Sequence, residues 1–266
     1  MALRILGSSG SLPGPDNPAS GYLLECTEVH TGVGDCESSR EGDQALSTSG
    51  LILDIGGGVL GALQKQGVNP ADYHVALSHL HADHCSDFAS LLVWRRYHPT
   101  LSATRSHMLC GPSGTPGLVA PDDFSDTFTF HAMNPDEPIR FDNGFELRVF
   151  PAVHPVEAYS MRITTPQGVL AYSGDSGPAD SLIECARGAD YFLCEATWGR
   201  SSAGKPANMH LSGAEAGAIA AAAGVKHFLI THIPPWVNSQ DAYEAAKAEF
   251  SGEITLVQAG DTYAFS

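Results

Sequence analysis

The sequence predicts a layered α/β fold, in which short strands alternate with helices. Nine segments are short, rich in β-branched or large apolar residues, and bounded by Gly, Pro or Asp, as strands of such a fold are. They are 3–7, 21–26, 50–56, 74–79, 107–111, 145–154, 168–175, 190–195 and 227–232. Helices are expected at about 57–66, 85–97, 179–187, 212–223 and 240–249. Ionisable residues end several of the strands, and strand ends converge on one edge of a sheet in such folds.

In chain order, the first five strand segments are LRILG, GYLLEC, GLILDIG, HVALSH and HMLCG, and the last four are FELRVFPAVH, GVLAYSGD, DYFLCE and HFLITH. The clearest helix start is at Ser212, whose hydroxyl can cap the helix while Glu215 closes a capping box ahead of an alanine-rich run. This start leaves His210 in the loop before a helix N-terminus. Residues 27–48 are polar and have no hydrophobic period, so we interpret them as a surface loop or hairpin insertion. We expect residues 1–266 to form a single domain.

Composition narrows the class of protein. The 266 residues are 43% hydrophobic and the mean hydropathy is −0.07, which is typical of a soluble chain that can bury a full core. No apolar run is long enough to span a bilayer, and the start MALRILGSSG is too polar for a signal peptide, so we expect no membrane partner and a cytoplasmic location. The six cysteines form no CxxC pair, which favours reduced thiols. The net charge of −16, with only 14 Lys and Arg, disfavours a large nucleic acid as partner.

The segment SHLHADHCSD crowds four potential metal ligands into six positions, and three further donors end or follow later strands. The seven are His79, His81, Asp83, His84, His154, Asp175 and His232. Imidazole nitrogen and carboxylate oxygen suit zinc, with manganese as the alternative. We expect one ion at His79, His81 and His154. The other takes Asp83, His84 and His232. Asp175 then bridges two divalent ions, which at a separation of roughly 3.5–4 Å lower the pKa of bound water to about 7.

Several other residues have a structural interpretation and need no role in the site. Six histidines lack such a context and fit surface or core positions: His30, His74, His98, His107, His131 and His227. An inert structural zinc is disfavoured for the cluster, because such sites have four closed ligands and usually cysteines. Cys85 fits a small buried side chain better than a ligand. Four residues could contact phosphate or base but are more often packing or surface residues: Trp94, Arg95, Arg96 and Trp236.

The motif SHLHADH resembles that of the metallo-β-lactamase fold, and LILDIGGG resembles the segment before it. The resemblance implies a four-layered αββα sandwich with a dinuclear metal site at one edge. It also implies that Asp54 orients a ligand histidine without binding metal itself. The family includes lactamases, glyoxalase II, lactonases and phosphodiesterases, so these motifs indicate the metal and leave the substrate open.

Later motifs are more selective. FPAVHPVEAYSMRI, AYSGDS, LCEATW, MHLSGAEAG and LITHIP resemble the ribonuclease Z branch of phosphodiesterases over nearly the whole chain apart from residues 27–48. Ribonuclease Z carries its tRNA-gripping arm between the ligands that correspond to His154 and Asp175, which here lie only 21 positions apart. We expect this interval to hold only a strand, a turn at TPQG and a second strand, with no room for the arm. With SSGSLPGPDNPASGYLLE, VWRRYHP and THIPPW, the chain is similar to an actinobacterial branch that includes an atypical class II cyclic AMP phosphodiesterase.

This resemblance implies a dinuclear-metal phosphodiesterase that hydrolyses a small phosphodiester, 3′,5′-cyclic AMP to 5′-AMP, with Asp83 needed for catalysis. His210 resembles the histidine that protonates the leaving oxygen, and the alternative is a capping or surface histidine. Glu195 either orients His210 or is a buried acid satisfied by backbone.

Three alternative functions make different demands on the sequence. A tRNA 3′-processing ribonuclease would need the arm and a basic patch. A thioester or lactone hydrolase would usually carry its third histidine in a PGH turn, which is absent here. A non-catalytic binding module would be expected to lose ligands. The expected partner is a small phosphodiester or cyclic nucleotide, and a homodimer is left open.

Overall fold

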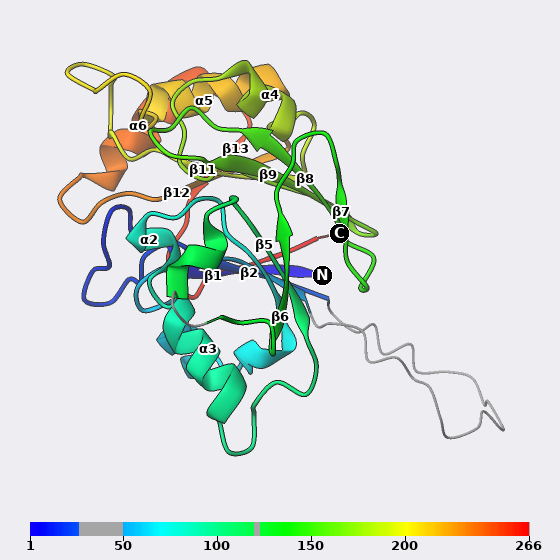
Figure 1. The fold of residues 1–266 in the computed structure, drawn as a ribbon. Coiled ribbons are helices and arrows are strands. Elements are labelled where there is room, and N and C mark those ends of the chain that lie inside the picture. Colours follow the sequence, from blue (N-terminus) through cyan, green and yellow to red (C-terminus); the bar gives the residue numbers. More distant parts are fainter. Residues whose placement is uncertain (27–49, 120–122, 266) are drawn as a thin grey trace, which may run out of the picture.

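The computed structural model describes residues 1–26, 50–119 and 123–265. Two mixed sheets pack face to face, and helices cover the outer side of each (Figure 1). The layers therefore run helix, sheet, sheet, helix, which confirms the predicted αββα sandwich. The insertion predicted at 27–48 lies outside the described residues.

The first sheet has, from edge to edge, β14 (Thr262–Ala264), β1 (Ala2–Gly7), β2 (Gly21–Glu25), β3 (Gly50–Ile55), β4 (His74–Ala76), β5 (His107–Gly111) and β6 (Phe128–Ala132). The second has β13 (Glu253–Leu256), β12 (His227–Thr231), β11 (Tyr191–Glu195), β10 (Gly168–Tyr172), β9 (Tyr159–Thr165), β8 (Glu146–Pro151) and β7 (Ile139–Arg140). Strands β3 to β6 pair in parallel, as do β10 to β13. Each sheet thus brings several carboxyl ends to one edge.

The helices are α1 (Val59–Lys65), α2 (Ala82–Cys85), α3 (Phe88–Tyr97), α4 (Asp180–Ala186), α5 (Gly213–Ala223) and α6 (Ser239–Glu249), with 3-10 turns η1 (Pro70–Asp72) and η2 (Thr115–Val119). Helices α1 and α3 pack on the first sheet, and α4 to α6 pack on the second. The predicted start of α5 is confirmed, because Ser212 Oγ accepts from the Glu215 N–H and the Glu215 carboxylate accepts from the Ser212 N–H.

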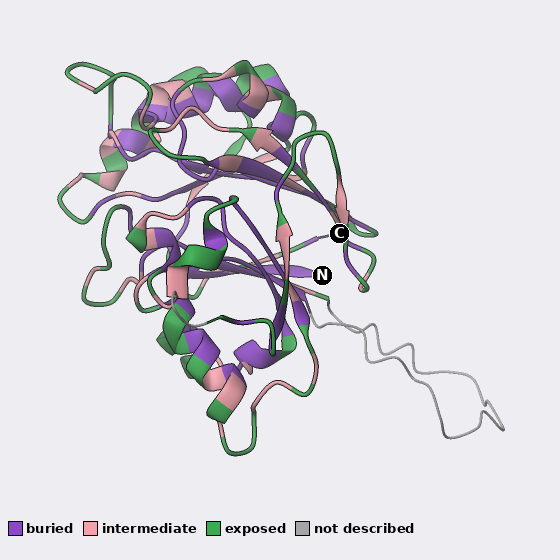
Figure 2. Cartoon of the chain, viewed as in Figure 1, coloured by how far each residue is buried: buried purple, intermediate pink, exposed green. Residues whose placement is uncertain are grey.

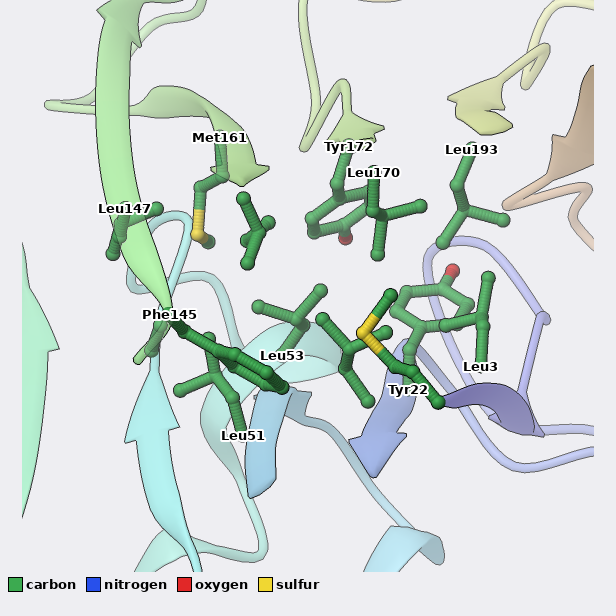
Figure 3. Close-up of a cluster of buried hydrophobic side chains, with 14 of the residues drawn as sticks. Leu3, Tyr22, Leu51, Leu53, Phe145, Leu147, Met161, Leu170, Tyr172 and Leu193 are labelled. Carbon is green, nitrogen blue, oxygen red and sulfur yellow. The ribbon is translucent and has the colours of Figure 1, made fainter. Parts of the chain in front are cut away.

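Strand β3 shows why these sequences form central strands. Leu51 and Leu53 point into the layer between the sheets, whereas Ile52 packs on the helical side. Both faces of the strand are buried, so its residues from Leu51 to Leu53 are apolar without alternation. Buried residues accordingly run along the central strands (Figure 2), and side chains from both sheets meet in the middle (Figure 3). Each fully buried leucine stabilises the fold by about 1.5–3 kcal/mol.

Several predicted helix and strand boundaries next to the site residues are wrong. The helix expected at 85–97 is two helices, and α2 begins inside the ligand motif, so Asp83 and His84 lie on a helical turn where a loop was expected. His79, His154 and Asp175 were expected to end strands. Each lies three residues beyond the last strand residue, because the chain must first turn over the sheet edge before a side chain can point inward. The two-residue turn between β9 and β10 matches the prediction for that interval.

The described cysteines are all free thiols. Cys85, Cys110, Cys185 and Cys194 are buried and Cys26 is exposed, whereas Cys36 lies outside the described residues. In the described part of the chain, no helix combines the length and apolar composition needed to cross a membrane.

Candidate metal centre

The structure brings all seven predicted ligands to the edge where the parallel strands of both sheets end. They form two groups, and within each group the ligand atoms lie within 4.8 Å of one another. The first group is His79, His81, His154 and Asp175, and the second is Asp83, His84, His232 and Asp175. Asp175 belongs to both groups. This is the division that the sequence predicted; that these residues bind ions stays a prediction.

Three imidazole nitrogens converge in the first group. The Nε2 atoms of His79 and His154 each lie 3.0 Å from Nδ1 of His81. Asp175 approaches the same place, with Oδ2 3.6 Å from Nε2 of His79. One shared proton can satisfy only two of three such nitrogens, whereas a cation can accept a lone pair from each.

The second group is equally close. Nε2 of His84 lies 3.1 Å from Nε2 of His232, which in turn lies 3.1 Å from Oδ2 of Asp83. Oδ1 of Asp175 lies 3.2 Å from Nε2 of His84. That oxygen is buried and has no hydrogen-bond partner among the described residues, so a polar atom is aimed at the centre of the group.

The surrounding hydrogen bonds indicate which ring nitrogens carry protons. Nδ1 of His84 lies 2.7 Å from Oδ2 of Asp54, so it donates, and in the neutral ring that can bind a metal Nε2 is left with a lone pair. The Thr197 hydroxyl donates to the carbonyl of His232 and therefore accepts from Nδ1 of the same ring, at 2.8 Å. The two bare Nε2 atoms then face each other. Lone pairs at this distance repel unless positive charge lies between them, so the donors fit a divalent cation.

Charge in the centre favours the same conclusion. Burial alone would raise the pKa of Asp175, but the neighbouring histidines, His232 and His84 first, hold it well below its ordinary value. Burial, and then the charge of His84, lower the pKa of His79, which keeps a lone pair available. Burial would also lower the pKa of His84, but Asp175 and Asp54 outweigh it and raise that pKa. The carboxylates thus attract positive charge to this place, as a metal site requires.

His210 lies beside both groups and is held by a buried acid. Its Nδ1 is 3.0 Å from Oε1 of Glu195, and its ring centroid is 5.5 Å from that of His154 and 5.7 Å from that of His232. Glu195 also accepts hydrogen bonds from the backbone N–H groups of Ser176, Thr197 and Leu211. Both interpretations of Glu195 are compatible with this geometry, since it is satisfied by backbone and also positioned to orient His210.

Glu195, His210 and His232 form a third compact grouping of potential ligands. Because both Glu195 oxygens already accept hydrogen bonds, this grouping is poorly suited to a further ion. Burial would lower the pKa of His210, but the charge of Glu195, followed by that of Asp175, raises it to about 9. Cations bound next to the ring oppose that rise.

Three residues that contact the ligand network were not predicted from the sequence: Ser78, Tyr172 and Thr197. Ser78 directly precedes His79, and Thr197 follows Glu195 by two residues, so a hydroxyl next to a predicted site residue was an available signal. Tyr172 gave no such signal, because it reaches its partner Asp54 across the space between the sheets.

Trp94, Arg95 and Arg96 on helix α3 were candidates for contact with phosphate or base. Their contacts instead fit the alternative interpretation, that they are packing or surface residues. Arg95 is buried, donates to the carbonyls of Ala71 and Thr127, and lies over the Phe128 ring. Trp94 donates to the side chain of Asn69, and Arg96 pairs with Asp126. Trp236 is 66% exposed, so it remains available at the surface. Cys85 is buried and donates to a carbonyl, as expected of a small packing residue.

Comparison with known proteins finds relatives that include a probable metallo-hydrolase, in agreement with a metal site. A family model described as a beta-lactamase superfamily domain matches residues 51–233. The chain belongs to the beta-lactamase superfamily. This superfamily chain is 45% identical to the uncharacterized protein Rv1339 of Mycobacterium tuberculosis, with 99% of this chain and 92% of that one covered. It is 28% identical to a ribonuclease Z of Mycolicibacterium paratuberculosis, over 88% of this chain and 95% of that one.

A probable metallo-hydrolase of Bacillus subtilis, YhfI, is 28% identical over 98% of each chain. Its crystal structure covers 98% of each chain with a TM-score of 0.83 and 25% identity. Together, superfamily membership and the two donor groups support a metal-dependent hydrolase.

We expect two metal ions per chain. Seven donors are too many for a single ion of four to six ligands, and Asp175 presents one oxygen to each group. Elemental analysis after purification without chelator and loading with zinc or manganese measures the stoichiometry. A value that stays at or below one ion per chain would contradict the bridged pair.

Asp83→Ala should abolish hydrolysis and leave the fold intact, because the carboxylate contacts His232 in the site whereas the core lies elsewhere. Circular dichroism and turnover are measured on the same preparation. Asp136→Ala, which removes an exposed carboxylate that belongs to neither donor group, serves as the matched control and should keep full activity. Retained turnover in Asp83→Ala would mean that the second group is not needed.

Proposed function

We propose that the protein is a metal-dependent phosphodiesterase that hydrolyses 3′,5′-cyclic AMP to 5′-AMP. The observation that carries the proposal is the placement of His210 next to both donor groups, with its Nδ1 held by Glu195. A phosphodiester needs both an attacking water and a proton for its leaving oxygen. The donor groups and His210 provide for these two needs at adjacent places.

When bound, the two cations supply positive charge for the phosphodiester oxygens and lower the pKa of the attacking water. The chain's own contribution to bond breaking is His210. Since Nδ1 is engaged by Glu195, Nε2 is the nitrogen that donates. The attacking water gives one proton to solvent and its hydroxyl bonds to phosphorus. The bond between phosphorus and the ribose 3′ oxygen breaks, and that oxygen takes the Nε2 proton of His210, which solvent then replaces. The product is then a 5′-phosphate with a free 3′ hydroxyl.

A small substrate is supported by the interval between His154 and Asp175. It contains β9, a two-residue turn and β10, all of which are described, and they leave no room for a tRNA-gripping arm. The net charge of −16 also disfavours a long polyanion, because the acidic protein repels its phosphates. The similarity to ribonuclease Z supports hydrolysis of a phosphodiester, and we infer that the substrate is a small molecule. The cytoplasmic location and the homodimer stay predictions.

A substrate panel tests the proposal. Metal-loaded protein is assayed on cyclic AMP, cyclic GMP, bis(p-nitrophenyl) phosphate, a tRNA precursor and a thioester. We expect turnover of the cyclic nucleotides and of bis(p-nitrophenyl) phosphate. Cleavage of the tRNA precursor alone would favour the ribonuclease Z alternative, and turnover of the thioester alone would favour the thioester or lactone hydrolase. Either result would overturn the proposal.

His210→Ala should slow hydrolysis of cyclic AMP by about 10²- to 10⁴-fold, the usual contribution of general acid catalysis. The same variant should lose far less activity on bis(p-nitrophenyl) phosphate, because p-nitrophenolate is a weak base that leaves without a proton. Turnover of both substrates is compared with that of His79→Ala, which should lose both activities alike. Equal losses in His210→Ala would assign the ring to substrate binding or to the helix start.

A further inference from the structure

One buried carboxylate is linked to both donor groups. Asp54 lies near the end of β3 with a left-handed φ of 56°, and its side chain is fully buried. Oδ1 accepts the N–H of Ser78 at 2.6 Å. Oδ2 accepts three hydrogen bonds of 2.7 Å each, from Ser78 Oγ, His84 Nδ1 and Tyr172 OH. A buried carboxylate with four donors has a single favourable orientation.

Ser78 carries this orientation on to the other donor group. Its hydroxyl has one proton, which it donates to Asp54, so towards Nδ1 of His79, at 3.1 Å, the hydroxyl oxygen can only accept. His79 must then hold its proton on Nδ1, and its Nε2 points with a lone pair at His81. Asp54 thus sets the ring of His84 directly and that of His79 through one hydroxyl, one ligand in each group.

Tyr172 is the donor that comes from the opposite sheet. It lies on β10, is 1% exposed, and reaches Asp54 on β3 across the inter-sheet layer, where its ring packs edge to face against Tyr22 (Figure 3). Burial raises the pKa of its phenol well above the ordinary value, so the hydroxyl remains a proton donor. The position of the second sheet, which carries Asp175 three residues after the end of β10, is therefore tied to the carboxylate that orients ligands of the first.

We propose that Tyr172 and Ser78 are positioning residues for metal binding: Tyr172 anchors Asp54 from the opposite sheet and affects both ions, whereas Ser78 directs His79 and affects one. The inference rests on the two metal sites and is independent of the substrate, so metal affinity tests it whichever substrate the panel selects.

The experiment measures zinc affinity by competition with a chromophoric chelator. Tyr172→Phe keeps the ring and removes the hydroxyl, and we expect both ions to bind about 10- to 100-fold more weakly, as for other partners of metal ligands. Tyr22→Phe is the matched control, because its hydroxyl also bridges the sheets, to Thr231 at 2.8 Å, without contacting Asp54. Wild-type affinity in Tyr172→Phe, or an equal loss in Tyr22→Phe, would overturn the role of Tyr172.

Ser78 has its own pair of variants. Ser78→Ala should weaken one ion much more than the other and Ser78→Thr, which keeps a hydroxyl, should restore the affinity. Nitrogen-15 spectra of the metal-free protein report the ring tautomers, and His79 should lose its Nδ1-protonated form in Ser78→Ala while His232 keeps its own. Unchanged tautomers or unchanged affinity would overturn the role of Ser78.

If Tyr172→Phe does not fold, Asp54→Asn replaces it. This variant should bind both ions more weakly, and wild-type zinc affinity would refute the network.

Discussion

A carboxylate sealed between two sheets has to be given hydrogen-bond donors on every side, since an unpaired buried charge costs several kcal/mol. Asp54 meets that requirement with donors from β10, from the turn after β4 and from α2. Each donor belongs to an element that carries a predicted metal ligand or leads directly to one. Satisfying one charge in the core therefore orients two predicted ligands, His84 and His79. The left-handed backbone of Asp54, which costs about 1–2 kcal/mol, is tolerated because these contacts hold it.

The second sheet repeats the arrangement with Glu195. That residue ends β11, is fully buried, and accepts three backbone N–H groups together with the ring of His210. Each sheet thus contributes one buried carboxylate that lies outside the two donor groups and holds a histidine. Rigid strands end just short of the site, and the turns that follow them are held by these two acids. Precision in the ligand positions comes from the hydrogen bonds of the turns more than from the strands.

The sequence predicted the central strands and missed four: β6, β7, β13 and β14. All four are edge strands, and in three of them no residue is fully buried, so their sequences lack the apolar run that marks a strand covered on both faces. The seven donors were predictable because four of them are crowded into six positions and the other three end or follow strands. Tyr172 was not predictable, since what gives it a role is a partner contributed by another strand, and a local motif does not encode that contact.

The acidic charge and the proposed substrate are compatible because electrostatic attraction in salt is local. At physiological ionic strength interactions between exposed charges fade over about 8 Å. The two divalent cations that we propose would outweigh the charge of the Asp83 and Asp175 carboxylates, and a cyclic nucleotide with a single phosphate would fit within that range. A tRNA would extend many such lengths across a surface whose net charge is −16, and each further phosphate would meet repulsion without gain. The same charge that disfavours a long polyanion is therefore compatible with the small phosphodiester that we propose as substrate.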